Sequence, residues 1–216
     1  MNHLPVAARV YVGCVIAAAV AILAAILPQL SMESPWLFAV LLLVSSFTSA
    51  FKVSLPLAKS GSTMSVSYAV DFASLLLLGP NPTMLVAIAS AWSQCTFRMK
   101  ERNPLYRTMF SMACLAVTVQ AAGFAYLWLG GVPGHLGSDL QSLAKPLVGA
   151  ATTYFVFNTA LIAIAISLST HQPFVQIWNE NFLWSAPSYF VGAGAAALAT
   201  WAISASGFWL AALAPG

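Results

Sequence analysis

Seven long apolar runs, separated by short polar or Pro- and Gly-containing segments, dominate this sequence of 216 residues. About 20 apolar residues is the length that a helix needs to cross the hydrocarbon core of a bilayer. Only 6% of the residues are charged and 60% are hydrophobic, whereas a soluble domain carries about a quarter charged residues. The runs are continuous and do not alternate as the strands of a membrane β-barrel do. The sequence therefore predicts an all-α fold, a polytopic transmembrane helical bundle that forms one integral membrane domain over residues 1–216.

The apolar runs predict about seven spans. The first run is followed by further spans, so we interpret it as a membrane helix and not as a cleaved signal peptide. The expected spans are residues 10–27, 35–51, 66–78, 83–97, 108–129, 146–168 and 185–203. The third and fourth are short and are separated by the helix-breaking motif GPNP, so a re-entrant pair stays open as an alternative to two crossings. The segment THQPFVQIWNENFLW, before the last span, is expected to lie at the membrane interface.

The basic residues predict the orientation of the bundle, because Lys and Arg are enriched in cytoplasmic loops. If the N-terminus is cytoplasmic and the seven spans alternate, only Lys145 of the eight basic residues faces outward. The others, all expected inside, are Arg9, Lys52, Lys59, Arg98, Lys100, Arg102 and Arg107. We therefore expect a multi-pass protein with a cytoplasmic N-terminus.

An incomplete eighth run, at residues 208–216, ends the sequence. At a rise of about 1.5 Å per residue it is too short to cross a bilayer core of about 30 Å. We expect that the natural chain continues and that this domain is cut before a cytoplasmic output domain. A short tail lying on the membrane surface is the alternative.

Asp71 is the one acidic residue inside a predicted span. A charged side chain near the bilayer centre costs at least about 2.5–3.5 kcal/mol on insertion scales, so its carboxyl group should meet protein, a cavity or a ligand. One hypothesis makes Asp71 part of a ligand, ion or proton site. The other places Asp71 near the interface as a cap at the start of the third span.

Four further polar or aromatic residues are expected at a similar depth: Trp92, Gln94, Gln120 and Asn158. Together with Asp71 they are candidates for one ligand pocket, because interrupted membrane helices are tolerated only beside protein or a cavity. Each of the polar side chains alone is also explained as a hydrogen-bonding contact between helices, worth about 0.6 kcal/mol on average. The small residues of GAGAAALA in the last span predict close helix packing, with a homodimer interface as the alternative.

No catalytic or metal-binding motif is found in the sequence. The histidines are scattered through loops and the N-terminus, and the three cysteines show no CxxC spacing. HExxH, P-loop and GxSxG motifs are missing from the printed sequence. We therefore expect that this chain is not an enzyme and holds no metal; it suggests no particular cofactor. Eight basic residues are also too few for a nucleic-acid surface, which leaves the lipid bilayer and a small molecule as expected partners.

Several segments resemble one family when they are taken in order. They are ARVYVG, FKVSLPL, GSTMSVSYAVDFASLLLLGP, WSQC, NPLYRTMFSMA, YFVGAGAAA and SGFWLAALAP. The chain resembles the N-terminal MASE-type membrane sensor domains of bacterial cyclic-di-GMP signalling proteins, which precede GGDEF or HD-GYP domains. The resemblance implies a bacterial cytoplasmic membrane protein that relays a signal to a cyclic-di-GMP output domain, in cis or in a partner protein. It also implies that a full-length parent is a diguanylate cyclase or a cyclic-di-GMP phosphodiesterase.

A second resemblance supplies the alternative function. The GP turn between two short apolar segments, after the polar start GSTMSVSYAVDF, is similar to the substrate-binding S components of energy-coupling factor micronutrient transporters. This alternative implies a subunit that binds a small molecule within the membrane and docks on an energising partner.

Overall fold

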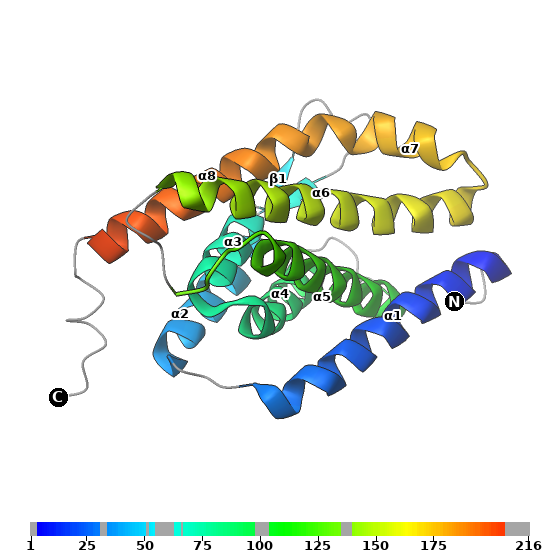
Figure 1. Ribbon diagram of the computed structural model, residues 1–216. Coiled ribbons are helices and arrows are strands. Elements are labelled where there is room, and N and C mark those ends of the chain that lie inside the picture. Colours follow the sequence, from blue (N-terminus) through cyan, green and yellow to red (C-terminus); the bar gives the residue numbers. More distant parts are fainter. Residues whose placement is uncertain are drawn as a thin grey trace.

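The computed structural model describes residues 4–30, 34–50, 52–54, 63–65, 67–97, 104–134 and 140–205. The fold is helical, and each of the seven predicted spans contains one helix of the bundle shown in Figure 1. These helices are α1 (Val6–Ile26), α2 (Pro35–Ala50), α3 (Ser67–Leu78), α4 (Pro80–Thr96), α5 (Leu105–Trp128), α6 (Leu140–Thr170) and α8 (Ala186–Ala205). Two short 3-10 turns, Leu27–Gln29 and Leu183–Ser185, follow α1 and precede α8.

Four helical stretches in the described part of the chain are long and apolar enough to cross a membrane. They are Val6–Ile26, Leu105–Trp128, Leu143–Thr170 and Phe174–Ala202, and Pro35–Ala50 and Ser67–Leu78 are shorter apolar helices. A membrane-embedded fold is thereby supported, whereas the count of seven crossings and the cytoplasmic N-terminus stay predictions. The basic residues Lys59, Arg98, Lys100 and Arg102 and the run 208–216 lie outside the described residues.

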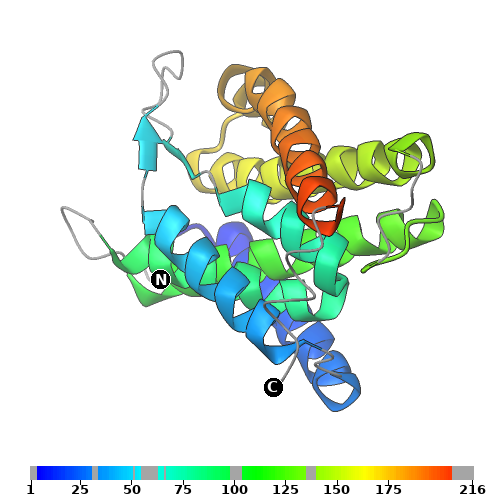
Figure 2. The ribbon, with the colours of Figure 1, turned by 90° about the vertical axis from the view of Figure 1, so that its left-hand side faces the viewer.

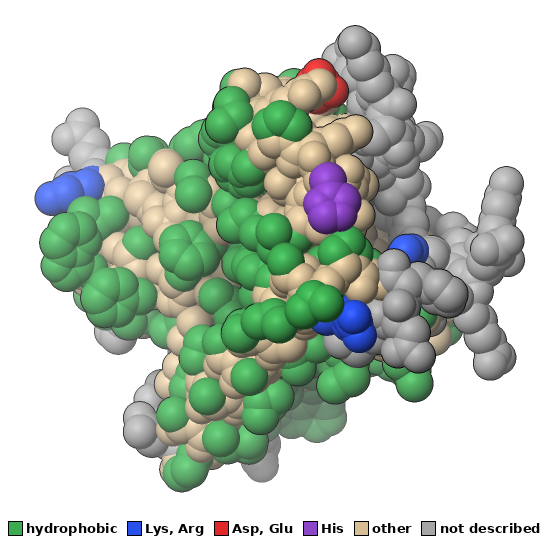
Figure 3. Space-filling view, turned by 90° about the vertical axis from the view of Figure 1, so that its right-hand side faces the viewer, with side chains coloured by type: hydrophobic (Ala, Val, Ile, Leu, Met, Phe, Trp, Pro, Cys, Tyr) green, Lys and Arg blue, Asp and Glu red, His purple; other side chains and the backbone are tan. Residues whose placement is uncertain are grey.

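The surface of the helices agrees with a lipid environment. Large apolar side chains such as Val10, Leu43, Phe124 and Val191 are more than half exposed, on four different helices. Figure 3 shows one face of the molecule, on which apolar side chains predominate and the charged ones are isolated. A soluble helix would instead carry polar and charged residues on its outer face.

The helices pack around α5 and α6, which lie against each other. α5 also contacts α1 and α4, while α2 packs on α3 and α4. α8 lies against α3 and α6 (Figure 1). The predicted interfacial segment contains a separate short helix, α7 (Phe174–Asn181), which packs on α6.

A small antiparallel hairpin, which the sequence reading did not predict, links α2 and α3. Its strands are β1 (Lys52–Ser54) and β2 (Thr63–Ser65), with Val53 opposite Met64. Figure 2 shows the hairpin projecting from the helical bundle. Three-residue strands are too short to give the alternating pattern by which a strand is recognised in a sequence.

The GPNP motif turns the chain between α3 and α4 in a single residue. Gly79 has φ +81°, a left-handed conformation that favours glycine. α4 then begins at Pro80, three residues earlier than predicted, because proline is well tolerated in the first turn of a helix. The turn is held from outside: the Gly134 N–H donates to the Leu76 carbonyl at 2.8 Å, and Gln120 Nε2 donates to the Pro80 carbonyl at 3.1 Å.

Candidate functional site: a cavity at one end of the bundle

Asp71 lies among helices and is 1% exposed. Ser45 of α2 donates a hydrogen bond to Oδ1 at 3.4 Å, and Tyr154 of α6 donates to Oδ2 at 2.7 Å. Both donors are neutral hydroxyl groups from other helices. No ion pair joins Asp71 to Arg9, Arg107 or Lys145, the basic residues whose side chains the structure describes. Asp71 therefore links α2, α3 and α6 through hydrogen bonds inside the bundle.

Tyrosine rings extend this polar cluster from α6 to α8. The ring of Tyr154 lies 5.8 Å from that of Tyr189 on α8, measured between centroids. Asn158, one turn along α6, donates from Nδ2 to the Tyr189 hydroxyl at 2.8 Å. The ring of Tyr68 on α3 lies 5.0 Å from that of Tyr189, again between centroids. Three helices thus meet at Tyr189.

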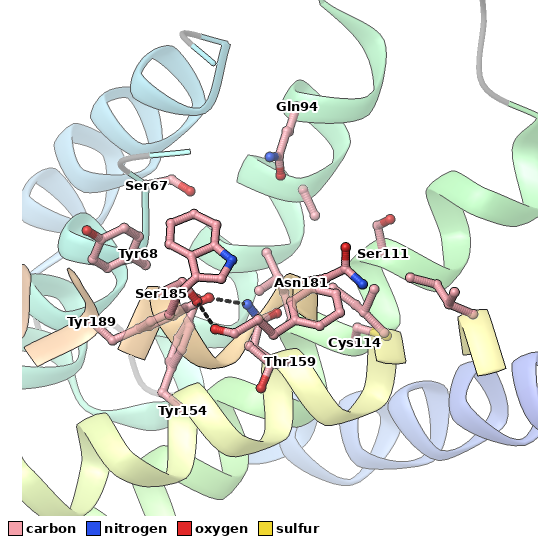
Figure 4. A pocket seen from close by; sticks show the side chains of 17 residues that line it. Ser67, Tyr68, Gln94, Ser111, Cys114, Tyr154, Thr159, Asn181, Ser185 and Tyr189 are labelled. Atoms are coloured by element: carbon pink, nitrogen blue, oxygen red, sulfur yellow. Dashed lines mark hydrogen bonds between the residues drawn. The ribbon is translucent and has the colours of Figure 1, made fainter. Parts of the chain in front are cut away.

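A cavity of about 320 Å³ lies beside this cluster. Its volume is at the lower end of the range for small-molecule pockets. The described residues that line it are Ser67, Tyr68, Ala91, Gln94, Ser111, Cys114, Leu115, Tyr154, Asn158, Thr159, Ile162, Ile166, Asn181, Phe182, Trp184, Ser185 and Tyr189. Figure 4 shows that labelled side chains from α3, α4, α5, α6 and α8 surround it.

The cavity is confined to one end of the bundle. Its lining includes the start of α3 at Ser67, the last turn of α4 at Gln94 and the second turn of α5 at Ser111. The Gly79 turn joins the opposite ends of α3 and α4. In the predicted orientation, each of the three lining positions lies on the cytoplasmic side.

The short helix α7 closes part of this end. Trp178 donates from Nε1 to the Thr159 hydroxyl at 2.9 Å. The Trp178 ring stacks on Phe174 with centroids 6.3 Å apart, and it lies 5.9 Å from the ring of Phe155 on α6. The hydrogen bond to Thr159 and the contact with Phe155 fix α7 to α6. Asn181 and Phe182, which follow Trp178, consequently form part of the cavity wall.

The structure brings some of the predicted pocket residues together and separates others. Gln94 and Asn158 line the cavity, and Asp71 lies behind its wall, in contact with Tyr154. Gln120 lies apart, because its amide bonds to the Pro80 carbonyl and to Met84 Sδ. Trp92 is 49% exposed and meets Phe97 edge-on, so it faces outward from α4.

Sequence reasoning missed the aromatic residues of the site. The cavity wall includes three tyrosines that contact one another across helices, Tyr68, Tyr154 and Tyr189. The sequence does not single them out, because an aromatic residue in an apolar helix has no distinctive pattern. One local signal was available: Tyr154 and Asn158 are four residues apart and therefore share a helix face. Tyr68 and Asp71 have the comparable spacing of three on α3.

Comparisons with known proteins agree with the sensor resemblance. A family model described as MASE9, which is a MASE-type membrane-associated sensor domain family, matches residues 35–203. The match extends from the first residue of α2 into α8 and covers more than half of the chain. No curated protein and no solved structure matches the chain. The suspected MASE domain is thereby confirmed, whereas the transporter alternative gains no support.

Proposed function

This chain belongs to the MASE9 family of membrane-associated sensor domains, and from that premise we propose that it detects a small molecule in the cavity and relays its presence through α8. In this proposal the output is a cyclic-di-GMP domain, as in the proteins that the sequence resembles. The full-length parent would be a diguanylate cyclase or a cyclic-di-GMP phosphodiesterase, and the present chain would contribute no catalytic group.

One observation carries the proposal: residues that line the cavity also hold α8 in place. Tyr189 and Ser185 line the cavity and lie at the start of α8 or just before it. Tyr189 accepts the Asn158 hydrogen bond from α6. Tyr68, another lining residue, packs so closely on Gly192 of α8 that a methyl group there would overlap the Tyr68 ring.

A ligand that touches Tyr68 and Tyr189 would therefore contact the interface of α8 with α3 and α6. Binding shifts a conformational equilibrium only if the ligand has different affinities for the two states. Here the two states would differ in the packing of α8. A small change in the Asn158–Tyr189 contact would be transmitted along α8, since a helix moves largely as a rigid element.

In the predicted orientation α8 begins on the cytoplasmic side and ends on the outer side, so a relay along α8 would reach a cytoplasmic domain only through the chain after residue 205. With the N-terminus in the cytoplasm, the cavity lies in the cytoplasmic half of the bundle. A ligand could then reach the site from the cytoplasm or from the inner leaflet. We propose the bacterial cytoplasmic membrane as the location, with the bundle acting as a multi-pass domain.

The test uses the complete gene product that contains this domain, expressed in a bacterium that carries a cyclic-di-GMP reporter. Tyr189→Phe and Asn158→Leu each remove the same hydrogen bond, so both should change the output in the same direction. Tyr106→Phe is the matched control, because Tyr106 lies at the start of α5, outside the cavity lining, and bonds with exposed Arg107. Equal output from the wild type and both cavity variants, at equal protein levels, would refute the relay through α8. A gene product without a cyclic-di-GMP domain would refute the proposed output.

A further inference from the structure

The charge of the cavity limits what it can bind. None of the 17 described lining residues is Asp, Glu, Lys, Arg or His. The carboxyl group of Asp71, which touches the lining residue Tyr154, does not line the cavity and accepts a hydroxyl hydrogen bond on each oxygen. Within the described lining, a charged ligand would lose its hydration without gaining a partner of opposite charge, which is strongly unfavourable in a low-dielectric site. The lining therefore favours an uncharged molecule.

Three neutral polar side chains of the lining, Gln94, Ser111 and Asn181, can offer hydrogen bonds to a ligand. Gln94 of α4 and Ser111 of α5 make no hydrogen bond within the described chain, and both line the cavity. Asn181 donates from Nδ2 to the Ile177 carbonyl at 2.9 Å, which leaves its side-chain oxygen as an acceptor. Figure 4 shows these three side chains on a different side of the site from Tyr68 and Tyr189. An amide and a hydroxyl can each donate and accept, so this side suits a neutral group that does both.

Aromatic rings form another part of the wall. They lie in the order Tyr68, Tyr189 and Tyr154, with neighbouring ring centroids 5.0 and 5.8 Å apart. Such walls favour a flat apolar body, because aromatic rings pack well in offset or edge-to-face arrangements. We propose that the cavity binds an uncharged amphiphile with a planar aromatic body and one neutral polar group of the carboxamide type. This inference rests on the proposed function, since both need the cavity to be a ligand site.

A matched pair of photoreactive probes tests the ligand class. The neutral probe is 4-benzoylbenzamide, and the charged one is 4-benzoylbenzoate, which has nearly the same shape. On irradiation the excited ketone takes a hydrogen atom from a nearby C–H bond, and the two resulting radicals join, so the site is labelled covalently. The full chain is irradiated in lipid nanodiscs, and labelled peptides are mapped by mass spectrometry. Labelling in 154–166 and 185–189 is divided by labelling of the lipid-exposed face of α1, which corrects for partitioning into the bilayer.

The expected ratio for the amide probe is on the order of tenfold higher than that for the carboxylate. Gln94→Leu should lower the affinity for the amide probe by about three- to tenfold, the effect of one lost hydrogen bond. Thr96→Val is the control, because Thr96 is exposed on the same helix and bonds to the Trp92 carbonyl. If 4-benzoylbenzoate labels the cavity as strongly, or Gln94→Leu binds the amide unchanged, the ligand class is wrong while the cavity remains a ligand site. If neither probe labels the cavity above α1, the ligand class is wrong, and the reporter assay of Tyr189→Phe and Asn158→Leu decides the proposed function separately.

Discussion

Tyr154 on α6 donates a 2.7 Å hydrogen bond to the carboxylate of Asp71 on α3, across 83 positions of the sequence. Both residues are buried, and the ring of Tyr154 lies 5.1 Å from that of Phe72, the residue after Asp71. The acid is therefore held by hydrogen bonds and aromatic packing together. This pairing is the direct connection between Asp71 and the cavity wall.

Replacing Asp71 separates its role as an acceptor from its charge. Asp71→Ala leaves the hydroxyls of Ser45 and Tyr154 without their acceptor, and an unsatisfied buried polar group costs about 1–3 kcal/mol. Asp71→Asn keeps one acceptor oxygen and the shape of the side chain, so its free energy of unfolding should fall less. Thermal unfolding in detergent, followed by tryptophan fluorescence, gives the order of stability. Asp71→Asn should nevertheless alter the signalling output; unchanged output with unchanged folding would remove Asp71 from the site.

The contact between Gly192 and Tyr68 predicts a sensitive position on α8. In Gly192→Ala the new methyl group would overlap the Tyr68 ring, and overpacking of this kind costs about 1–3 kcal/mol. Gly194→Ala is the control on the same helix, because a methyl group at that position would meet nothing within 4 Å. Unfolding midpoints of the two variants should therefore differ clearly, and Tyr68→Leu should restore part of the loss in Gly192→Ala. Equal midpoints would mean that α8 does not pack on α3 as described.

The orientation predicts where fused reporters will lie. A reporter enzyme joined after Lys100 should be active in the cytoplasm, and one joined after Ser138 should report an external location. The physical reason is the retention of Lys and Arg on the cytoplasmic side of the membrane. Paired alkaline phosphatase and fluorescent protein fusions check each position. Both reporters on the same side would contradict the crossing of α5.

The sequence predicted the helices well because lipid requires long apolar segments whose backbone groups are paired internally. Each predicted span contains a helix, and α3 ends at Leu78 as expected. The boundaries were less accurate where proline was involved: α6 begins at Leu140 and includes Pro146, the predicted first residue of that span. A helix can continue through a proline when other contacts compensate for the missing N–H, so Pro146 does not mark the start of α6.

The cavity was only partly predictable from the sequence. Gln94 and Asn158 were identified because polar residues are rare in apolar helices, and this signal is independent of the fold. The same signal included Gln120, whose amide bonds to the Pro80 carbonyl away from the cavity. Which side of a helix faces a neighbour depends on tertiary packing. For that reason the convergence of Tyr68, Tyr154 and Tyr189 from three helices could not be derived from spacing alone.

The turn at Gly79 has a consequence for the surrounding lipid. α3 has 12 residues and is therefore about 18 Å long, well short of the ~30 Å hydrocarbon thickness. Gly79 itself is buried, with Pro133 against it. If α3 starts at one membrane surface, the chain reverses direction within the acyl region, and lipids beside this part of the bundle must tilt or shorten to match it. Mismatch of this kind carries an energy that grows with the difference between the two lengths. A change in bilayer thickness would then change the energy of the α3 end at Leu78, on the same helix as Asp71.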